Sequence, residues 1–313
     1  MRIAVLAGGI GAARFLRGVR AARPDAEITV VGNTGDDITL HGLRICPDLD
    51  TVMYTLGGGI HEEQGWGRDG ESFTVQGELA AYGVGPDWMH LGDKDIATHL
   101  VRTRMLDAGY PLSAVTRALC ERWKPGVELI PMSDDRVETH VLLEGRAVHF
   151  QEWWLAMRAA EPAKGFVGIG AETAKPAPGV VEAIEGADVV LLPPSNPVVS
   201  IGSILSVTGI RDAVARTKAP VVGLSPIIGG APVRGMADAC LQAIGVQTSA
   251  AAVGAHYGAR AEGGLLDGWL VDSSDADAVV DGVPVVAIPL LMSSTDATEA
   301  MADAALALAE AVS

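Results

Sequence analysis

Residues 2–18 read RIAVLAGGIGAARFLRG, and this stretch decides the fold. Residues 2–7 are aliphatic and β-branched without alternation, which predicts a strand buried on both faces of a parallel sheet. The glycine-rich segment 8–11 forms a turn, and residues 12–22 continue as a helix. Residues 27–32 repeat the buried-strand pattern. The chain is therefore expected to open with a βαβ unit.

The buried-strand pattern returns after residue 178, whereas the middle of the chain shows helical spacing and one hairpin. We therefore expect a doubly wound, mostly parallel Rossmann-like α/β sheet from residues 1–59 and 166–313, with a mainly helical insertion at residues 60–165. The expected later strands are 187–192, 220–223, 268–271 and 285–289; the expected helices are 49–56, 95–108, 113–123, 151–160, 210–217, 234–244, 249–257 and 295–312; the hairpin pairs 139–144 with 146–150.

Composition indicates a globular protein that does not bind nucleic acid. The chain has 313 residues, of which 49% are hydrophobic and 20% charged, so it can bury a large core without disulfides or a structural metal. Its formal net charge of −16 repels phosphate backbones, although a local basic pocket for one nucleotide remains open.

Cysteines and hydropathy favour the cytoplasm. Cys46, Cys120 and Cys240 are far apart and odd in number, which fits neither a disulfide framework nor a zinc pattern. No apolar run reaches the roughly 18 residues of a membrane span. Glycines interrupt the apolar start, so we interpret it as a strand and a turn rather than a signal peptide.

The first candidate site is the glycine turn. Gly8, Gly9 and Gly11 lie between a strand and a helix, where backbone N–H groups can meet a phosphate. It is an incomplete dinucleotide fingerprint, because Arg14 stands at the third glycine position and Asn33, not an acidic residue, ends the second strand. A nucleotide or phosphate contact and a tight turn without a ligand both remain open; an NAD-dependent dehydrogenase is disfavoured.

The second candidate is a pair of acidic loops. Asp36 and Asp37 follow one strand, and Asp48 and Asp50 open the next helix. Four carboxylates within fifteen residues repel one another unless a cation compensates, and Mg²⁺ is commonly held by one or two carboxylates plus substrate phosphates. The alternative is a solvated loop in which Asp48 merely caps the helix.

Three further segments carry polar groups. Asp93, Lys94 and Asp95 precede a helix; either aspartate could cap it, and Lys94 could then face a ligand. The segments Ser195–Asn196 and Ser225–Gly230 each follow a buried strand, where small polar groups suit a nucleotide but also ordinary turns. No paired metal-ligand histidines, nucleophile elbow or Walker loop occurs, so hydrolase and P-loop functions lose support.

Five segments together carry a resemblance to a known family. The sequence resembles the 2-phospho-L-lactate transferase family of coenzyme F-420 biosynthesis, and its actinobacterial branch, described as phosphoenolpyruvate transferases, looks closest. The resemblance extends from residue 1 to about residue 310. The matching motifs are MRIAVLAGGIGAARFLRG at 1–18, GNTGDDITLHGLRICPDLDTVMYTLGGG at 32–59, YGVGPDWMHLGDKDIATHLVR at 82–102, LLPPSNPVVSIGSIL at 191–205 and LSPIIGGAPVRGMAD at 224–238.

The resemblance implies a transfer between two small molecules with Mg²⁺ as cofactor. The donor would be guanosine diphosphate carrying an enolpyruvyl or lactyl group, and the acceptor the deazaflavin Fo. The terminal ribityl hydroxyl of Fo would attack the distal phosphorus, and GMP would leave. The family also implies a possible homodimer.

The resemblance carries roles onto matching residues. Asp36 and Asp48 match the metal-binding aspartates, while Asp50 and Lys94 match acceptor-binding positions. All three aspartates are thus candidate catalytic residues, with Asp50 or metal activation alone as the means of activating the hydroxyl. The family commonly has Arg where this chain has Lys94, which keeps the charge but loses the planar fork. The donor-nucleotide region is matched by Gly8, Gly9, Gly11, Ser195 and Asn196, and we add Ser225 as a further candidate from its strand-end loop.

One alternative function, which is not enzymatic, stays open. A regulatory nucleotide-sugar-binding protein of the same fold, similar to gluconeogenesis-factor relatives, would bind a nucleotide and turn nothing over. The acceptor motifs PDLD and LGDKD argue against it. The insertion is expected to cover the deazaflavin ring, with Trp66, Trp88 and Met89 as candidates that could equally be core residues.

Overall fold

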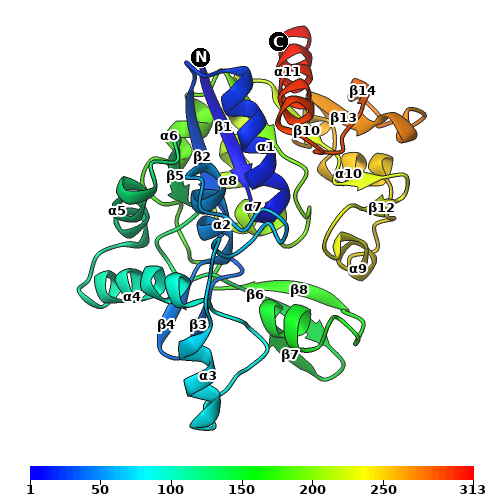
Figure 1. Ribbon diagram of the computed structural model, residues 1–313. Coiled ribbons are helices and arrows are strands. Elements are labelled where there is room, and N and C mark those ends of the chain that lie inside the picture. Colours follow the sequence, from blue (N-terminus) through cyan, green and yellow to red (C-terminus); the bar gives the residue numbers. More distant parts are fainter.

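The computed structural model describes residues 1–313, and its centre is a seven-stranded sheet (Figure 1). All its strand pairs are parallel, in the order β14-β13-β10-β9-β1-β2-β5. This is the order 3-2-1-4-5-6 of a Rossmann sheet extended by one strand, so the doubly wound prediction is confirmed. The strands are β1 (Arg2–Ala7), β2 (Glu27–Gly32), β5 (Glu128–Pro131), β9 (Val189–Leu192), β10 (Val221–Leu224), β13 (Gly268–Asp272) and β14 (Val285–Ile288).

Two large hydrophobic cores lie on the two faces of this sheet. Strand β1 shows why: Ile3 and Val5 pack into one core, and Ala4 and Leu6 into the other. Helices α1 (Gly9–Ala22), α2 (Pro47–Leu56), α5 (Leu112–Trp123) and α11 (Thr295–Ala311) cover one face. The other face is covered by α6 (Val180–Glu185), α7 (Ile201–Ser206), α8 (Ile210–Arg216), α9 (Ala237–Ala243) and α10 (Ala250–Tyr257).

The smaller elements gather beyond the carboxyl ends of β1 and β2, opposite the two chain termini (Figure 1). They comprise the hairpin β3 (Ile38–Leu40) and β4 (Leu43–Ile45), the helices α3 (Thr74–Ala81) and α4 (Asp93–Asp107), and a three-stranded antiparallel sheet of β6 (Glu138–Leu143), β7 (Arg146–His149) and β8 (Gly165–Ile169). The minor elements are the pair β11 (Ile227–Ile228) and β12 (Ala231–Pro232), the π-helix η1 (Glu152–Ala156), and the 3₁₀ helices η2 (Arg260–Glu262) and η3 (Ser273–Asp275).

Residues 60–165 are less uniform than the sequence predicts. They contain α3, α4 and α5, and the predicted hairpin is confirmed as β6 and β7. However, strand β5 within this range pairs with β2 at the edge of the main sheet. The chain therefore returns to the main sheet once inside the expected insertion, and the boundaries near 60 and 165 stay a prediction. No helix is both long and apolar enough to cross a membrane.

Helix α1 packs closely on helix α11 at Gly18. A Cβ at this position would lie 2.2 Å from the backbone oxygen of Thr298. We expect Gly18→Ala to destabilise the protein by about 1–3 kcal/mol, because the two helices must separate. Gly77→Ala is the matched control, since the same methyl group on helix α3 meets open space. Urea unfolding should show the control unchanged or more stable by up to about 1 kcal/mol; equal stability of Gly18→Ala and wild type would contradict the packing argument.

Candidate functional site

The site lies where the strand order of the main sheet reverses, between β1 and β9. In open α/β sheets, ligands bind at this switch point, outside the carboxyl ends of the strands. The loops after the two strands touch: Ser195 Oγ donates a hydrogen bond to the Gly8 carbonyl at 2.7 Å. A Cβ at position 11 would lie 2.2 Å from the Pro194 oxygen, so this close approach requires Gly11.

A cavity of about 810 Å³ opens at the switch point. Its volume suits a ligand the size of a nucleotide derivative. Trp66, Trp88 and Met89 line this cavity, and their role in covering an aromatic ring stays a prediction. The site residues that the sequence predicts and that line this cavity are Gly8, Gly9, Gly11, Asp36, Asp48, Asp50, Ser195, Asn196 and Ser225.

Two of the four carboxylates of the acidic loops have a basic partner, and two do not. Asp37 pairs with Arg44 at 3.1 Å, and Asp50 pairs with the buried Arg102. Asp36 and Asp48 form no ion pair, although both are buried and line the cavity. Asp36 and Asp48 are therefore the two acids whose charge nothing in the chain neutralises.

Burial and neighbouring carboxylates raise the pKa of both acids. Burial and the neighbouring Asp48 carboxylate raise the pKa of Asp36 well above its ordinary value. Burial raises the pKa of Asp48 to about 6, against the lowering effect of a hydrogen bond from Asn33 Nδ2, which lies 2.8 Å from Asp48 Oδ2. Asp36 Oδ1 has no hydrogen-bond partner.

These groups fit a hard divalent cation. Two buried carboxylates, one with an unpartnered oxygen, supply the oxygen ligands that Mg²⁺ prefers while leaving positions for substrate phosphates. Asp48 does not cap its helix, because Cys46 precedes Pro47 at the start of α2 and no side chain caps it. The capping alternative for Asp48 is therefore wrong.

Lys94 does not lie in the cavity with the other predicted site residues. It is exposed and outside the cavity lining, and its Nζ donates to the Asp69 carbonyl at 2.8 Å. Neither Asp93 nor Asp95 caps helix α4, because the Glu71 carboxylate accepts hydrogen bonds from the Lys94 and Asp95 amides in its first turn, each at 2.8 Å. Asp93 instead accepts hydrogen bonds from the Thr74 and Val75 amides at the start of α3. A contact of Lys94 with the acceptor stays a prediction.

Two arginines beside the glycine turn were not predicted as site residues. Arg14 and Arg234 both line the cavity. Burial lowers the pKa of Arg14, and the neighbouring Arg234 charge lowers it further. Arg14 Nη2 donates to the Glu62 carbonyl at 3.2 Å, and Arg234 Nη1 donates to the Gln64 carbonyl at 3.0 Å. They form a local basic patch in an acidic chain, where phosphates would be attracted.

A buried cluster on helices α2 and α4 was also missed. Tyr54 Oη donates to Asp95 Oδ1 at 2.7 Å, and His99 and Arg102 lie near Asp50. The signal was present in the sequence: Asp95, His99 and Arg102 are spaced four and three residues apart and so share one helix face.

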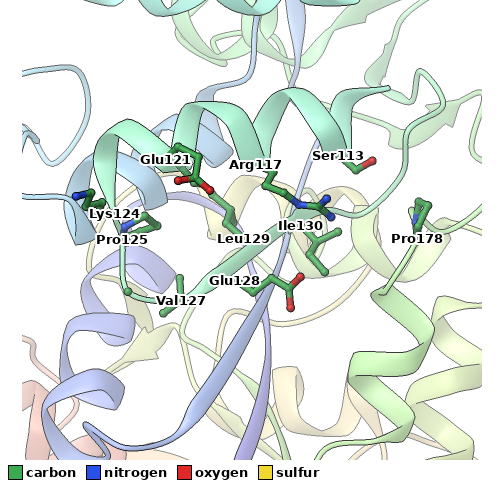
Figure 2. A pocket seen from close by; sticks show the side chains of 12 residues that line it. Ser113, Arg117, Glu121, Lys124, Pro125, Val127, Glu128, Leu129, Ile130 and Pro178 are labelled. Carbon is green, nitrogen blue, oxygen red and sulfur yellow. The ribbon is translucent and has the colours of Figure 1, made fainter. Parts of the chain in front are cut away.

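A second cavity, of about 470 Å³, lies between helix α5 and strand β5 (Figure 2). Arg117 and Glu121 project from the helix and Glu128 from the strand, so its lining mixes both signs of charge. None of the predicted site residues lines it. The switch-point cavity is therefore the candidate active site.

Fold and cavity together define a doubly wound α/β protein with a ligand site at its switch point. Residues 3–282 match the family model described as "2-phospho-L-lactate transferase CofD". The chain belongs to this family.

Relatives match over the full chain. The "Phosphoenolpyruvate transferase" of Streptomyces coelicolor is 67% identical and covers 100% of this chain and 99% of its own length. Proteins with the same name from Thermobifida fusca and Mycolicibacterium smegmatis are 66% and 58% identical, each covering 99% of this chain and 98% and 99% of their own. A Bacillus halodurans structure at 18% identity shares the fold, with a TM-score of 0.63 over 97% of this chain and 99% of that chain.

Proposed function

We propose that this chain is a phosphoenolpyruvate transferase of coenzyme F-420 biosynthesis. It moves the phosphoenolpyruvyl group of enolpyruvyl-diphospho-guanosine to the ribityl hydroxyl of Fo and releases GMP. The activity for which the full-length relatives are named and the family match support this proposal. In the geometry, the observation that carries it is the pair of buried, unpaired carboxylates Asp36 and Asp48 beside the glycine turn.

Donor binding is assigned to the switch point. The turn at Gly8–Gly11 brings backbone N–H groups at the start of helix α1 to the diphosphate. Asn33 holds Asp48 through its hydrogen bond, and Asp36 and Asp48 would bind Mg²⁺. When bound, this cation neutralises charge that develops on the phosphoryl oxygens. Arg14 and Arg234 add positive charge at the same cavity wall.

Acceptor binding is assigned to the side of the cavity formed by helices α2 and α4. Asp50 Oδ2 is buried without a partner and can accept a hydrogen bond from a ribityl hydroxyl. Trp66, Trp88 and Met89 offer apolar surface for the deazaflavin ring. Lys94 would take part only by leaving Asp69, which its flexible stem permits. Positioning of the two substrates then contributes most of the remaining rate.

The test is a reconstitution with purified protein, Fo, Mg²⁺ and the guanylylated donor. We expect equimolar GMP and a more anionic deazaflavin, separated by anion exchange and weighed by mass spectrometry. Omitting Fo controls for donor hydrolysis, and competing enolpyruvyl and lactyl donors in one mixture measures donor preference. Absence of GMP with either donor would contradict the proposal and favour the non-catalytic nucleotide-binding alternative, which the names of the full-length relatives do not support.

A further inference from the structure

His99 is held in one tautomer by its neighbour. Both His99 and Arg102 are only 1% exposed, and Arg102 Nη1 lies 3.0 Å from His99 Nδ1. A guanidinium only donates hydrogen bonds, so Nδ1 must be the acceptor. The imidazole is therefore neutral, with its proton on Nε2.

This Nε2–H has no hydrogen-bond partner. The nearest carboxylate oxygen, Asp95 Oδ2, is 3.7 Å away, which is too far for a hydrogen bond. Asp50 Oδ2 is likewise buried and unpartnered, because Arg102 binds the other oxygen of that carboxylate. Leaving a buried polar group without a partner is energetically costly. An unsatisfied donor and an unsatisfied acceptor thus lie at the same cavity wall, since His99 and Asp50 both line it.

A metal ion does not suit the cluster of Asp50, Asp95 and His99. One nitrogen of His99 and one oxygen each of Asp50 and Asp95 lie within 4.8 Å of one another, as metal ligands would. However, the Arg102 guanidinium binds both Asp50 and His99 Nδ1, so its positive charge already occupies the cluster and repels a metal ion.

One hydroxyl group can satisfy both the unpartnered His99 Nε2–H and the unpartnered Asp50 Oδ2. It accepts one hydrogen bond and donates another through a single oxygen. Asp50 Oδ2 lies 3.7 Å from the Nδ1 atom of the same His99 ring, so the Nε2–H and this oxygen are close enough for one hydroxyl oxygen with two hydrogen bonds of normal length to bridge them. The acceptor, whose polyol chain carries several hydroxyls, is the substrate that offers such a group.

We propose that His99 Nε2–H and Asp50 Oδ2 together bind one hydroxyl of the acceptor's polyol chain, with Arg102 as the positioning residue that fixes the histidine tautomer. This inference rests on the proposed function. The resemblance already assigns Asp50 to the acceptor; the roles of His99 and Arg102 are new. Asp95 and Tyr54 pack beside His99 and satisfy each other through their hydrogen bond.

Two substitutions at His99 test the contact. His99→Phe keeps a ring of similar shape without the N–H, and His99→Gln places an amide N–H near the position of Nε2. We expect His99→Phe to raise the Kd and KM for Fo about tenfold or more, with the KM for the donor and the Kd for GDP unchanged. His99→Gln should stay within about threefold of wild type. His256→Phe removes an exposed imidazole that does not line the cavity and should leave all these constants unchanged.

A second ligand separates this contact from a structural role. A deazaflavin with a plain alkyl chain in place of the polyol should bind wild type and His99→Phe equally, as measured by titration followed through the absorbance of the chromophore. If His99→Phe weakens both ligands alike, or weakens GDP binding, the residue is only structural and the proposal is wrong.

The wild-type protein provides a measurement that needs no variant. In ¹⁵N-labelled protein, long-range ¹H–¹⁵N correlation of the His99 ring should show a protonated Nε2 and an unprotonated Nδ1, and saturation with Fo should shift the Nε2 signal. A proton on Nδ1, or no shift on Fo binding, overturns the proposal. Failure of the proposed function is distinct, because it would appear as no GMP release by wild type.

Discussion

We expect Asp48→Asn to lower transfer activity by on the order of 10³-fold, because several kcal/mol of charge stabilisation are lost with the cation site. The same variant should make the metal-free protein more stable at neutral pH. Asp48 is buried with no basic partner, so its charge is a source of instability in the absence of a cation. Asp36→Asn should act in the same way, since its neighbour Asp48 opposes its ionisation.

The stability effect has a defined pH dependence. The pKa of Asp48 is raised from an unfolded value of 3.8 to about 6 in the fold. A group of this kind contributes its full stability below about pH 4 and loses it as the pH rises through about 6. The stability gained by Asp48→Asn over wild type should therefore be small at pH 4 and grow to on the order of 3 kcal/mol at pH 7.5.

Addition of Mg²⁺ tests whether the effects of Asp48→Asn come from the loss of a cation site. Adding Mg²⁺ should raise the Tm of wild type at pH 7.5 and leave Asp48→Asn unchanged, because only a folded site that binds the cation gains stability from it. Asp281→Asn replaces an exposed acid outside the cavity and should behave as wild type in turnover and in Tm. Retained turnover in both Asp36→Asn and Asp48→Asn at saturating Mg²⁺ would contradict the metal assignment.

Arg102→Met should be the most destabilising single change in the site. Removing one partner of a buried ion pair leaves the other charge uncompensated, at a cost of about 3–5 kcal/mol. Arg102 binds Asp50, His99 Nδ1 and the Arg44 carbonyl, so all three lose a partner. We expect the loss in urea unfolding, together with a raised KM for Fo.

A double-mutant cycle isolates the ion pair. Asp50→Asn combined with Arg102→Met should recover much of the stability, because no buried charge then remains unpaired, while acceptor binding stays impaired. Arg104→Met changes an exposed arginine on the same helix and should cost less than about 0.5 kcal/mol. If Arg102→Met and Arg104→Met were equally mild, the pair with Asp50 would be unimportant for the fold.

Much of the scaffold was predictable because its signals are local. The buried run in β1, the glycines that follow it and the second buried strand determine the first βαβ unit, and the positions of Asp36 and Asp48 at strand and helix ends follow from it. Strand β5 was missed because Glu128–Pro131 is only four residues long and ends in proline, which resembles a loop.

Which of the four aspartates form ion pairs, and which stay free to bind a cation, was not predictable. Asp37 and Asp50 look like Asp36 and Asp48 in sequence, but Arg44 and Arg102 neutralise them from positions 7 and 52 residues away. Such pairing depends on how helix α4 and the β3–β4 hairpin pack, which periodicity does not determine. For the same reason, the charge of Lys94 was visible in the sequence, but its direction toward Asp69 was not.

We propose that Asp36 and Asp48 hold a divalent cation against the donor diphosphate at the switch point of the sheet. A crystal structure with GDP and Mn²⁺, located by its anomalous signal, tests it most directly. We predict Mn²⁺ bound to both carboxylates and to diphosphate oxygens, with the diphosphate on the turn at Gly8–Gly11. Manganese at the cluster of Asp50, Asp95 and His99, or a diphosphate distant from Asp36 and Asp48, would contradict the account.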